Sequence, residues 1–192
     1  MSVNGRGLDY WWCKLRAIVL LVVGRRHAAE ALFDEMLQRW PLDAYALASR
    51  AILRAQLGRR EAALEDAQAL VAAHPQRSAA DWFNLAYLFE DAARLGEAER
   101  AFRQALELDP KLDRAWYGLG LTLIRLRRFD EAVAALKRNT ELQPMSPFGW
   151  YQLARVHMDR HEPDQTRRII RHLQGFEPKV AAQLERETGL AP

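Results

Sequence analysis

The sequence predicts an all-α fold, an array of stacked helix hairpins, and three observations support this. Prolines recur every 34 or 35 residues, at Pro41, Pro75, Pro110, Pro144 and Pro178. With each proline set as position 32 of a 34-residue unit, positions 8 and 20 are small throughout: Ala17, Ala51, Ala86, Gly120 and Ala154, then Ala29, Ala63, Ala98, Ala132 and Thr166. Apolar residues follow helical spacing, as in Trp82, Leu85, Ala86 and Phe89. Such a hairpin must stack on neighbours to bury its apolar face.

The period divides the chain into an N-terminal tail, five units and a C-terminal segment. The expected bounds are 1–9 for the tail, 10–43, 44–78, 79–112, 113–146 and 147–178 for the units, and 179–192 for the last segment. Each proline ends a second helix, and Ser146 with Pro147 is typical of an N-cap and first helical residue. Val180, Ala181 and Leu184 predict a final helix that caps the last hairpin.

The pattern Trp-x-x-Leu-Gly, followed by a later alanine, an aromatic residue and a proline, resembles the tetratricopeptide repeat family. The third and fourth units match best, with Trp82, Leu85 and Ala86, then Trp116, Leu119 and Gly120. The resemblance covers about residues 10–178 and implies a right-handed superhelix. It also implies a scaffold that binds proteins rather than an enzyme.

The first two units depart from the family pattern. Cys13 and Leu47 stand at the tryptophan position, and Arg16 and Arg50 stand where the family has leucine. A one-residue slip of the first helices would explain these departures.

The resemblance implies a concave face, lined by the first helix of each unit, that holds a peptide or a partner helix. The residues carried onto this groove are Phe83, Tyr87, Arg114, Tyr117, Leu121, Phe148, Tyr151 and Arg155. Phe83, Tyr117 and Tyr151 form an aromatic column suited to apolar side chains, and arginines could pair with acidic groups. The alternative is that these rings only support neighbouring helices.

The N-terminal helix expected at 10–24 is apolar nearly all round. We predict that its edge docks onto a second copy of the chain, another protein or a membrane surface, unless it is buried between repeats. The residues of this predicted docking edge are Trp11, Trp12, Leu15, Ile18, Val19 and Val22.

A column of arginines falls on the hairpin turns, at Arg25, Arg59, Arg94 and Arg128. Stacking would align them into a basic edge that could meet an acidic protein, nucleic acid or anionic lipid. A solvated turn is the favoured interpretation, because no nucleic-acid-binding motif accompanies the arginines.

The composition gives little indication of a catalytic, metal-binding or membrane-spanning function. Net charge is only +3, the single cysteine cannot form an internal disulfide, and the longest apolar run, 17–23, is too short to span a membrane. We therefore expect a cytoplasmic protein without a cofactor. His157 and His161 are four residues apart, with Asp159 and Asp164 nearby. A zinc site would need a third and a fourth ligand, and His157 falls at a core position, so a metal-dependent or enzyme-accessory function is the least favoured alternative. The prediction is a non-catalytic interaction scaffold, with a self-associating subunit as the alternative.

Overall fold

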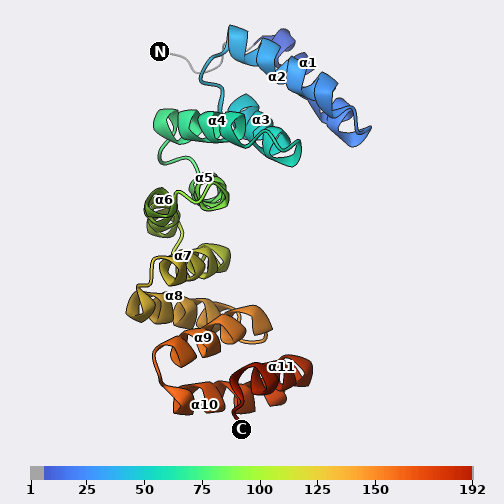
Figure 1. Ribbon diagram of the computed structural model, residues 1–192. Coiled ribbons are helices and arrows are strands. Elements are labelled where there is room, and N and C mark those ends of the chain that lie inside the picture. The colour runs from blue at the N-terminus through green and yellow to red at the C-terminus, as the bar shows by residue number, and fades with distance from the viewer. Residues whose placement is uncertain (1–6, 192) are drawn as a thin grey trace. The chain divides into compact units, whose positions relative to one another are not determined.

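The computed structural model describes residues 7–191, and this part of the chain forms eleven α-helices and no strand (Figure 1). The helices are α1 (Leu8–Val22), α2 (Arg26–Arg39), α3 (Ala44–Gln56), α4 (Arg60–Ala73), α5 (Ala79–Asp91), α6 (Leu95–Leu108), α7 (Asp113–Arg125), α8 (Phe129–Leu142), α9 (Pro147–Asp159), α10 (Pro163–Gln174) and α11 (Pro178–Thr188). The predicted all-α fold class is confirmed. The chain divides into two compact units, Met1–Leu88 and Phe89–Pro192, which are described separately.

In the first unit each of the helices α1 to α4 packs against the next, and in the second unit the same holds for α6 to α11. The helices α3, α5, α7 and α9 begin at Ala44, Ala79, Asp113 and Pro147, the first residues of the second to fifth expected repeats. Ser146 is the N-cap of α9 with Pro147 as the first helical residue, but its side chain makes no capping hydrogen bond. A side-chain cap is present at α3 instead, where an oxygen of Asp43 accepts a 2.8 Å hydrogen bond from the backbone N–H of Ala46.

The two columns of small residues lie in the interior. All ten members of positions 8 and 20 are buried, and the side chains that replace alanine fit for different reasons. The Thr166 hydroxyl donates a 3.1 Å hydrogen bond to the carbonyl of Ala154, so no polar atom is left unpaired there. At Gly120, a Cβ would lie 2.7 Å from Cγ of Leu136, so the absence of a side chain lets α7 and α8 approach closely.

The tryptophans that repeat every 34 residues are only partly buried, and each is tied to the loop before its helix. The indole N–H of Trp82 donates to the carbonyl of Pro75 at 2.8 Å. Trp116 and Trp150 make the same bond, at 2.9 Å, to the carbonyls of Pro110 and Pro144. The hydrogen bond between the periodic tryptophan and the carbonyl of the periodic proline therefore fixes the position of the loop that precedes each of these helices.

The first two hairpins keep the same frame as the later ones, so the expected one-residue slip is absent. Cys13 and Leu47 are buried at the tryptophan position. Arg16 is exposed on α1. Arg50 lies at the leucine position of α3 and is accommodated there by carboxylates of the neighbouring helices.

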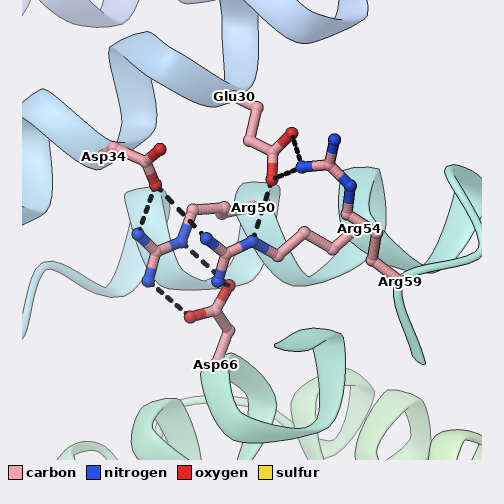
Figure 2. A network of polar contacts seen from close by, with 6 residues as sticks. All are labelled: Glu30, Asp34, Arg50, Arg54, Arg59 and Asp66. Carbon is pink, nitrogen blue, oxygen red and sulfur yellow. Dashed lines mark hydrogen bonds and ion pairs between the residues drawn. The ribbon is translucent and has the colours of Figure 1, made fainter. Parts of the chain in front are cut away.

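Figure 2 shows this network of three arginines and three carboxylates, drawn from α2, α3, α4 and the residue before α4: Glu30, Asp34, Arg50, Arg54, Arg59 and Asp66. Asp66 is the centre, because it accepts hydrogen bonds of 2.9 and 2.6 Å from Arg50 and one of 2.9 Å from Arg54. On the opposite side, Asp34 accepts from Arg50 at 2.6 Å and from Arg54 at 3.3 Å. Equal numbers of opposite charges make the cluster neutral as a whole.

Glu30 closes the network at its outer end. Its side chain is buried and accepts hydrogen bonds from Arg54 at 3.1 Å and from Arg59 at 2.6 and 2.7 Å. Burial acts to raise the pKa of Glu30, but the bonds and charges of the two arginines outweigh it, so this pKa lies below its ordinary value of 4.5.

The depressed pKa predicts an acid-sensitive contribution to stability. Because the folded-state pKa lies below the unfolded one, stability from the Glu30 carboxylate is present above about pH 4.5 and is lost as pH falls through the folded pKa. As the pH is lowered from about 5 to about 3, we expect the free energy of unfolding of Glu30→Gln to fall less steeply than that of the wild type. Urea titrations at each pH measure this, with Glu141→Gln as the exposed control. Parallel curves for wild type and Glu30→Gln would contradict the prediction.

Candidate functional site

In the second unit, the aromatic residues of the predicted groove line a pocket of about 280 Å³. Tyr117 comes from α7, and Phe148 and Tyr151 come from α9. Phe148 keeps 69% of its surface exposed, which is unusual for a phenylalanine, whereas both tyrosines are partly buried. The final helix, α11, completes the pocket with Val180 and Gln183.

The phenol of Tyr151 is held by α11. Its hydroxyl donates a 2.6 Å hydrogen bond to Glu187, and Gln183 bonds both partners, at 2.8 Å to Glu187 and 3.5 Å to Tyr151. The hydrogen bond to Glu187, aided by burial, raises the pKa of Tyr151, and the same bond lowers the pKa of Glu187. The Arg155 guanidinium lies 5.9 Å from the centre of the Tyr151 ring.

These contacts change the expected role of the predicted arginines. Arg114, Leu121 and Arg155 are not among the residues that line the pocket. The charge of Arg155 also contributes to lowering the pKa of Glu187, after the hydrogen bonds from Tyr151 and Gln183. The pairing of arginines with acidic groups of a partner stays a prediction.

In the first unit, a smaller and more apolar pocket of about 190 Å³ lies on α3, α4 and α5. Tyr87 and Ile52 line it and are 60% and 47% exposed. Alanines at positions 48, 51 and 55 leave the hollow open, because their side chains fill little space. Phe83 is partly buried and does not line this pocket.

Several lining residues were not predicted from the sequence: Ala48, Ile52, Asn84, Pro147, Gln152, Val180 and Gln183. The small residue at position 5 of the second repeat (44–78), Ala48, was a usable signal for a hollow in the first unit. The part played by α11 had no comparable signal, since a capping helix is expected to be polar outside and carries no family groove positions.

The predicted docking edge on α1 is exposed. The exposed fractions are 60% for Trp11, 61% for Trp12, 51% for Leu15, 43% for Ile18, 51% for Val19 and 81% for Val22. The opposite side of α1 packs Tyr10, Cys13 and Ala17 into the core of the first hairpins. Burial of this helix between repeats, the alternative considered above, does not occur in the described residues.

The arginines of the predicted basic edge are the N-cap residues of α2, α4, α6 and α8, and three of them are paired with carboxylates. Arg59 contacts Glu30, and Arg94 contacts Glu97. Arg128 bonds Glu99 of α6 and Glu131 of α8, each at 2.6 Å. The pairs Arg59–Glu30 and Arg128–Glu99 join neighbouring helices, whereas Arg94–Glu97 and Arg128–Glu131 lie within the first turn of one helix. The arginine column therefore has a structural role, and its use as a binding edge stays a prediction.

The two histidines of the least favoured alternative differ in environment. His157 is buried with Nδ1 2.7 Å from Glu162, and His161 is exposed on the turn after α9. Within residues 7–191, no group of three or more His, Cys, Asp or Glu side chains could hold a metal ion. In the same range, no helix is long and apolar enough to cross a membrane.

Solved structures show the same fold. A segment of MamA from Desulfovibrio magneticus RS-1 superposes with a TM-score of 0.79 at 16% identity, over 96% of this chain and 99% of that one. YrrB, described as a TPR protein with an unusual peptide-binding site, gives 0.79 at 16% identity over 88% of each chain. A tetratricopeptide repeat protein from Parabacteroides merdae ATCC 43184 gives 0.83 at 19% identity over 95% of this chain and 75% of that one.

Comparison of the sequence with known proteins identifies a family but no individual relative. No curated protein matches the sequence significantly. The family model of the tetratricopeptide repeat matches residues 14–78 and 83–147, which is more than half of the chain. The chain therefore belongs to the tetratricopeptide repeat family.

Proposed function

We propose that this protein is a non-catalytic scaffold that binds a segment of another protein on its first-helix surface. The observation that carries the proposal is the pocket of Tyr117, Phe148 and Tyr151 in the second unit, with Phe148 left 69% exposed. Family membership supports the class of function, and the pocket supports where the partner binds.

The pocket is suited to an apolar side chain of the partner. Aromatic rings offer large apolar area at little conformational cost, and covering them with a partner removes that area from water. A ring such as Phe148 costs free energy while it is exposed, so its placement beside a hollow favours a binding role over internal support.

Polar groups at the rim of the pocket can orient the partner. Gln152 and Gln183 bring side-chain amides to a surface otherwise lined by rings, Pro147 and Val180. The NH2 group of Gln183 already bonds Glu187 and Tyr151, so this side chain offers its carbonyl oxygen as an acceptor. An extended or helical segment of a partner carries backbone groups or polar side chains that can pair with these amides. The apolar pocket would then give affinity, and the amides would fix register.

The first unit carries a second hollow of matching character. Tyr87 and Ile52 flank a floor of alanines, so this pocket also accepts an apolar side chain. The description of YrrB as a protein with a peptide-binding site gives a precedent for this use of the fold, at an identity that supports the fold alone.

Selection of peptides tests the proposal. A displayed library of random peptides would be selected on the full chain, and the recovered peptides would be measured by fluorescence anisotropy. We expect Phe148→Ala to weaken binding by about tenfold or more, since truncating an aromatic anchor at the centre of an interface commonly has this effect. The exposed position of Phe148 keeps the stability cost small, within about 0.5 kcal/mol.

Phe129→Ala is the matched control. Phe129 is a partly buried ring at the start of α8 and does not line the pocket, so its truncation should leave the affinity unchanged. Equal affinity of wild type and Phe148→Ala for every selected peptide would remove this pocket as the binding site. Failure to recover any peptide with an apolar anchor would contradict the proposed partner chemistry.

A further inference from the structure

We propose that the exposed face of α1 binds the surface of an anionic lipid bilayer, lying in the interface without crossing it. This inference concerns a surface on the first unit and does not depend on the pocket of the second unit.

The first step is the division of α1 into two faces. At the roughly 100° per residue of an α-helix, Tyr10, Cys13 and Ala17 share one face, which packs into the core of the first hairpins. The opposite face spans an arc of roughly 140° and contains only apolar side chains. Its members are Leu8, Trp11, Trp12, Leu15, Ile18, Val19, Val22 and Val23, which are 43–88% exposed.

The second step is that this arc is too wide for one partner helix. Two helices that pack together touch along a narrow seam of ridges and grooves. An α1–α1 contact between two copies would cover the middle of the arc and leave Ile18 on one side or Val23 on the other in water. The exposed side chains together offer roughly 1,000 Å² of apolar surface, and a fluid bilayer interface can adapt to the whole of it.

The third step is the distribution of charge around the apolar arc. Lys14 and Arg16 lie on its two flanks, Arg25 and Arg26 are exposed just beyond its C-terminal end, and Asp9 is the sole acidic residue of α1. The carboxylates on neighbouring α2 are engaged elsewhere: Glu30, Asp34 and Glu35 each pair with an arginine. Arg16, Arg25 and Arg26 are therefore left as exposed positive charges at the border of the apolar arc, and they complement anionic headgroups.

The tryptophans strengthen the assignment. Trp11 and Trp12 lie near the N-terminal end of α1, toward opposite sides of the arc. The Lys14 amine lies 5.4 Å from the Trp11 ring and 4.3 Å from the ring of Tyr45. Indole rings prefer the headgroup region of a membrane, where an apolar body and a polar N–H are both satisfied. Lysine and arginine stems beside them can extend their charges toward the lipid phosphates.

Vesicle flotation with the full chain tests the proposal. The probes are vesicles of phosphatidylcholine alone and vesicles with about one third phosphatidylglycerol, a fraction chosen to give a negative surface potential. We expect wild type to float with the anionic vesicles and Ile18→Glu/Val22→Glu to bind at least about tenfold more weakly. Acyl chains labelled with bromine should quench tryptophan fluorescence of the wild type, as expected for Trp11 and Trp12 at the interface.

Two further variants separate the causes. Leu42→Glu/Met145→Glu adds the same two charges at exposed apolar side chains outside α1 and should leave vesicle binding unchanged. Arg25→Gln/Arg26→Gln should weaken binding to anionic vesicles and reduce its dependence on salt. Circular dichroism of each variant verifies that the helices are intact.

Three results would overturn the inference. The first is that wild type binds neither kind of vesicle, and the second is that it binds neutral and anionic vesicles equally, which would remove the electrostatic complementarity. Alternatively, light scattering could show a stable dimer that Ile18→Glu/Val22→Glu dissociates and that does not float, which would assign the face to a second copy. None of these results bears on peptide binding by the second unit, so the two proposals fail separately.

Discussion

Replacing Asp66 with alanine is expected to lower the free energy of unfolding by about 3–5 kcal/mol, the largest effect of any single carboxylate discussed above. The side chain of Asp66 is only 4% exposed and accepts three hydrogen bonds from Arg50 and Arg54. Its removal leaves the guanidinium groups of Arg50 and Arg54, whose side chains are each 16% exposed, short of a counter-charge and of hydrogen-bond acceptors. Water cannot fully replace these partners at a site so little exposed.

Urea denaturation followed by circular dichroism measures this loss. Glu141→Ala is the control, because Glu141 is 61% exposed in an ion pair with Arg138 and its removal should change stability by less than about 1 kcal/mol. Asp66→Asn keeps the shape of the side chain but not its charge, so it should lose most of the same stability. If Asp66→Asn were as stable as wild type, packing rather than charge would account for the site.

Replacing Gly118 with alanine is expected to cost about 1–3 kcal/mol, although alanine is the better helix former. A Cβ at Gly118 would lie 2.4 Å from Cζ of Phe102, and Phe102 is only 1% exposed, so its ring has little room to move. The close approach of α6 and α7 therefore depends on the missing side chain. Thermal and urea unfolding both report the loss.

The control for this change is a second helical glycine. Gly96 lies in the first turn of α6 with no neighbouring atom within 4 Å of a Cβ, so Gly96→Ala should raise stability by up to about 1 kcal/mol. Adding Phe102→Leu to Gly118→Ala should recover part of the loss, because the shorter side chain clears the position of the new methyl group. Strictly additive effects of the two substitutions would contradict the proposed clash.

The repeating architecture could be predicted because it depends on residues whose physical role is local and periodic. Proline ends a helix wherever it falls, and a small residue at position 8 or 20 allows close packing in every unit, so a 34-residue period was enough to place the hairpins. The same periodicity predicted the aromatic column of Phe83, Tyr117 and Tyr151, of which Tyr117 and Tyr151 line the pocket of the second unit and Phe83 does not. Tyr117, Phe148 and Tyr151 share a pocket because they recur on one face of consecutive first helices.

Other features arise from contacts between residues that are far apart in the sequence. Arg50 at a leucine position suggested a shifted helix, because its acceptors, Asp34 and Asp66, come from two other helices and have no fixed spacing from it. The hydrogen bond from Trp116 to the Pro110 carbonyl could not be predicted from the sequence, because every residue has a backbone carbonyl that could accept it. The contribution of Gln183 to the pocket depends on where α11 settles, which periodicity alone does not determine.

The network of three arginines and three carboxylates that joins α2, α3 and α4 also limits how such a chain can evolve. Arrays of similar repeats commonly grow or shrink by duplication, since each unit packs on its neighbour in the same way. Arg50 and Arg54 need carboxylates at the two α2 positions that Glu30 and Asp34 occupy. The equivalent pairs in the second, third and fourth repeats are Leu64 and Gln68, Glu99 and Arg103, and Val133 and Lys137. If a duplication placed any of those hairpins before the second repeat, Arg50 and Arg54 would lose one or both of these carboxylates. The charged residues therefore determine which hairpin can precede the second repeat.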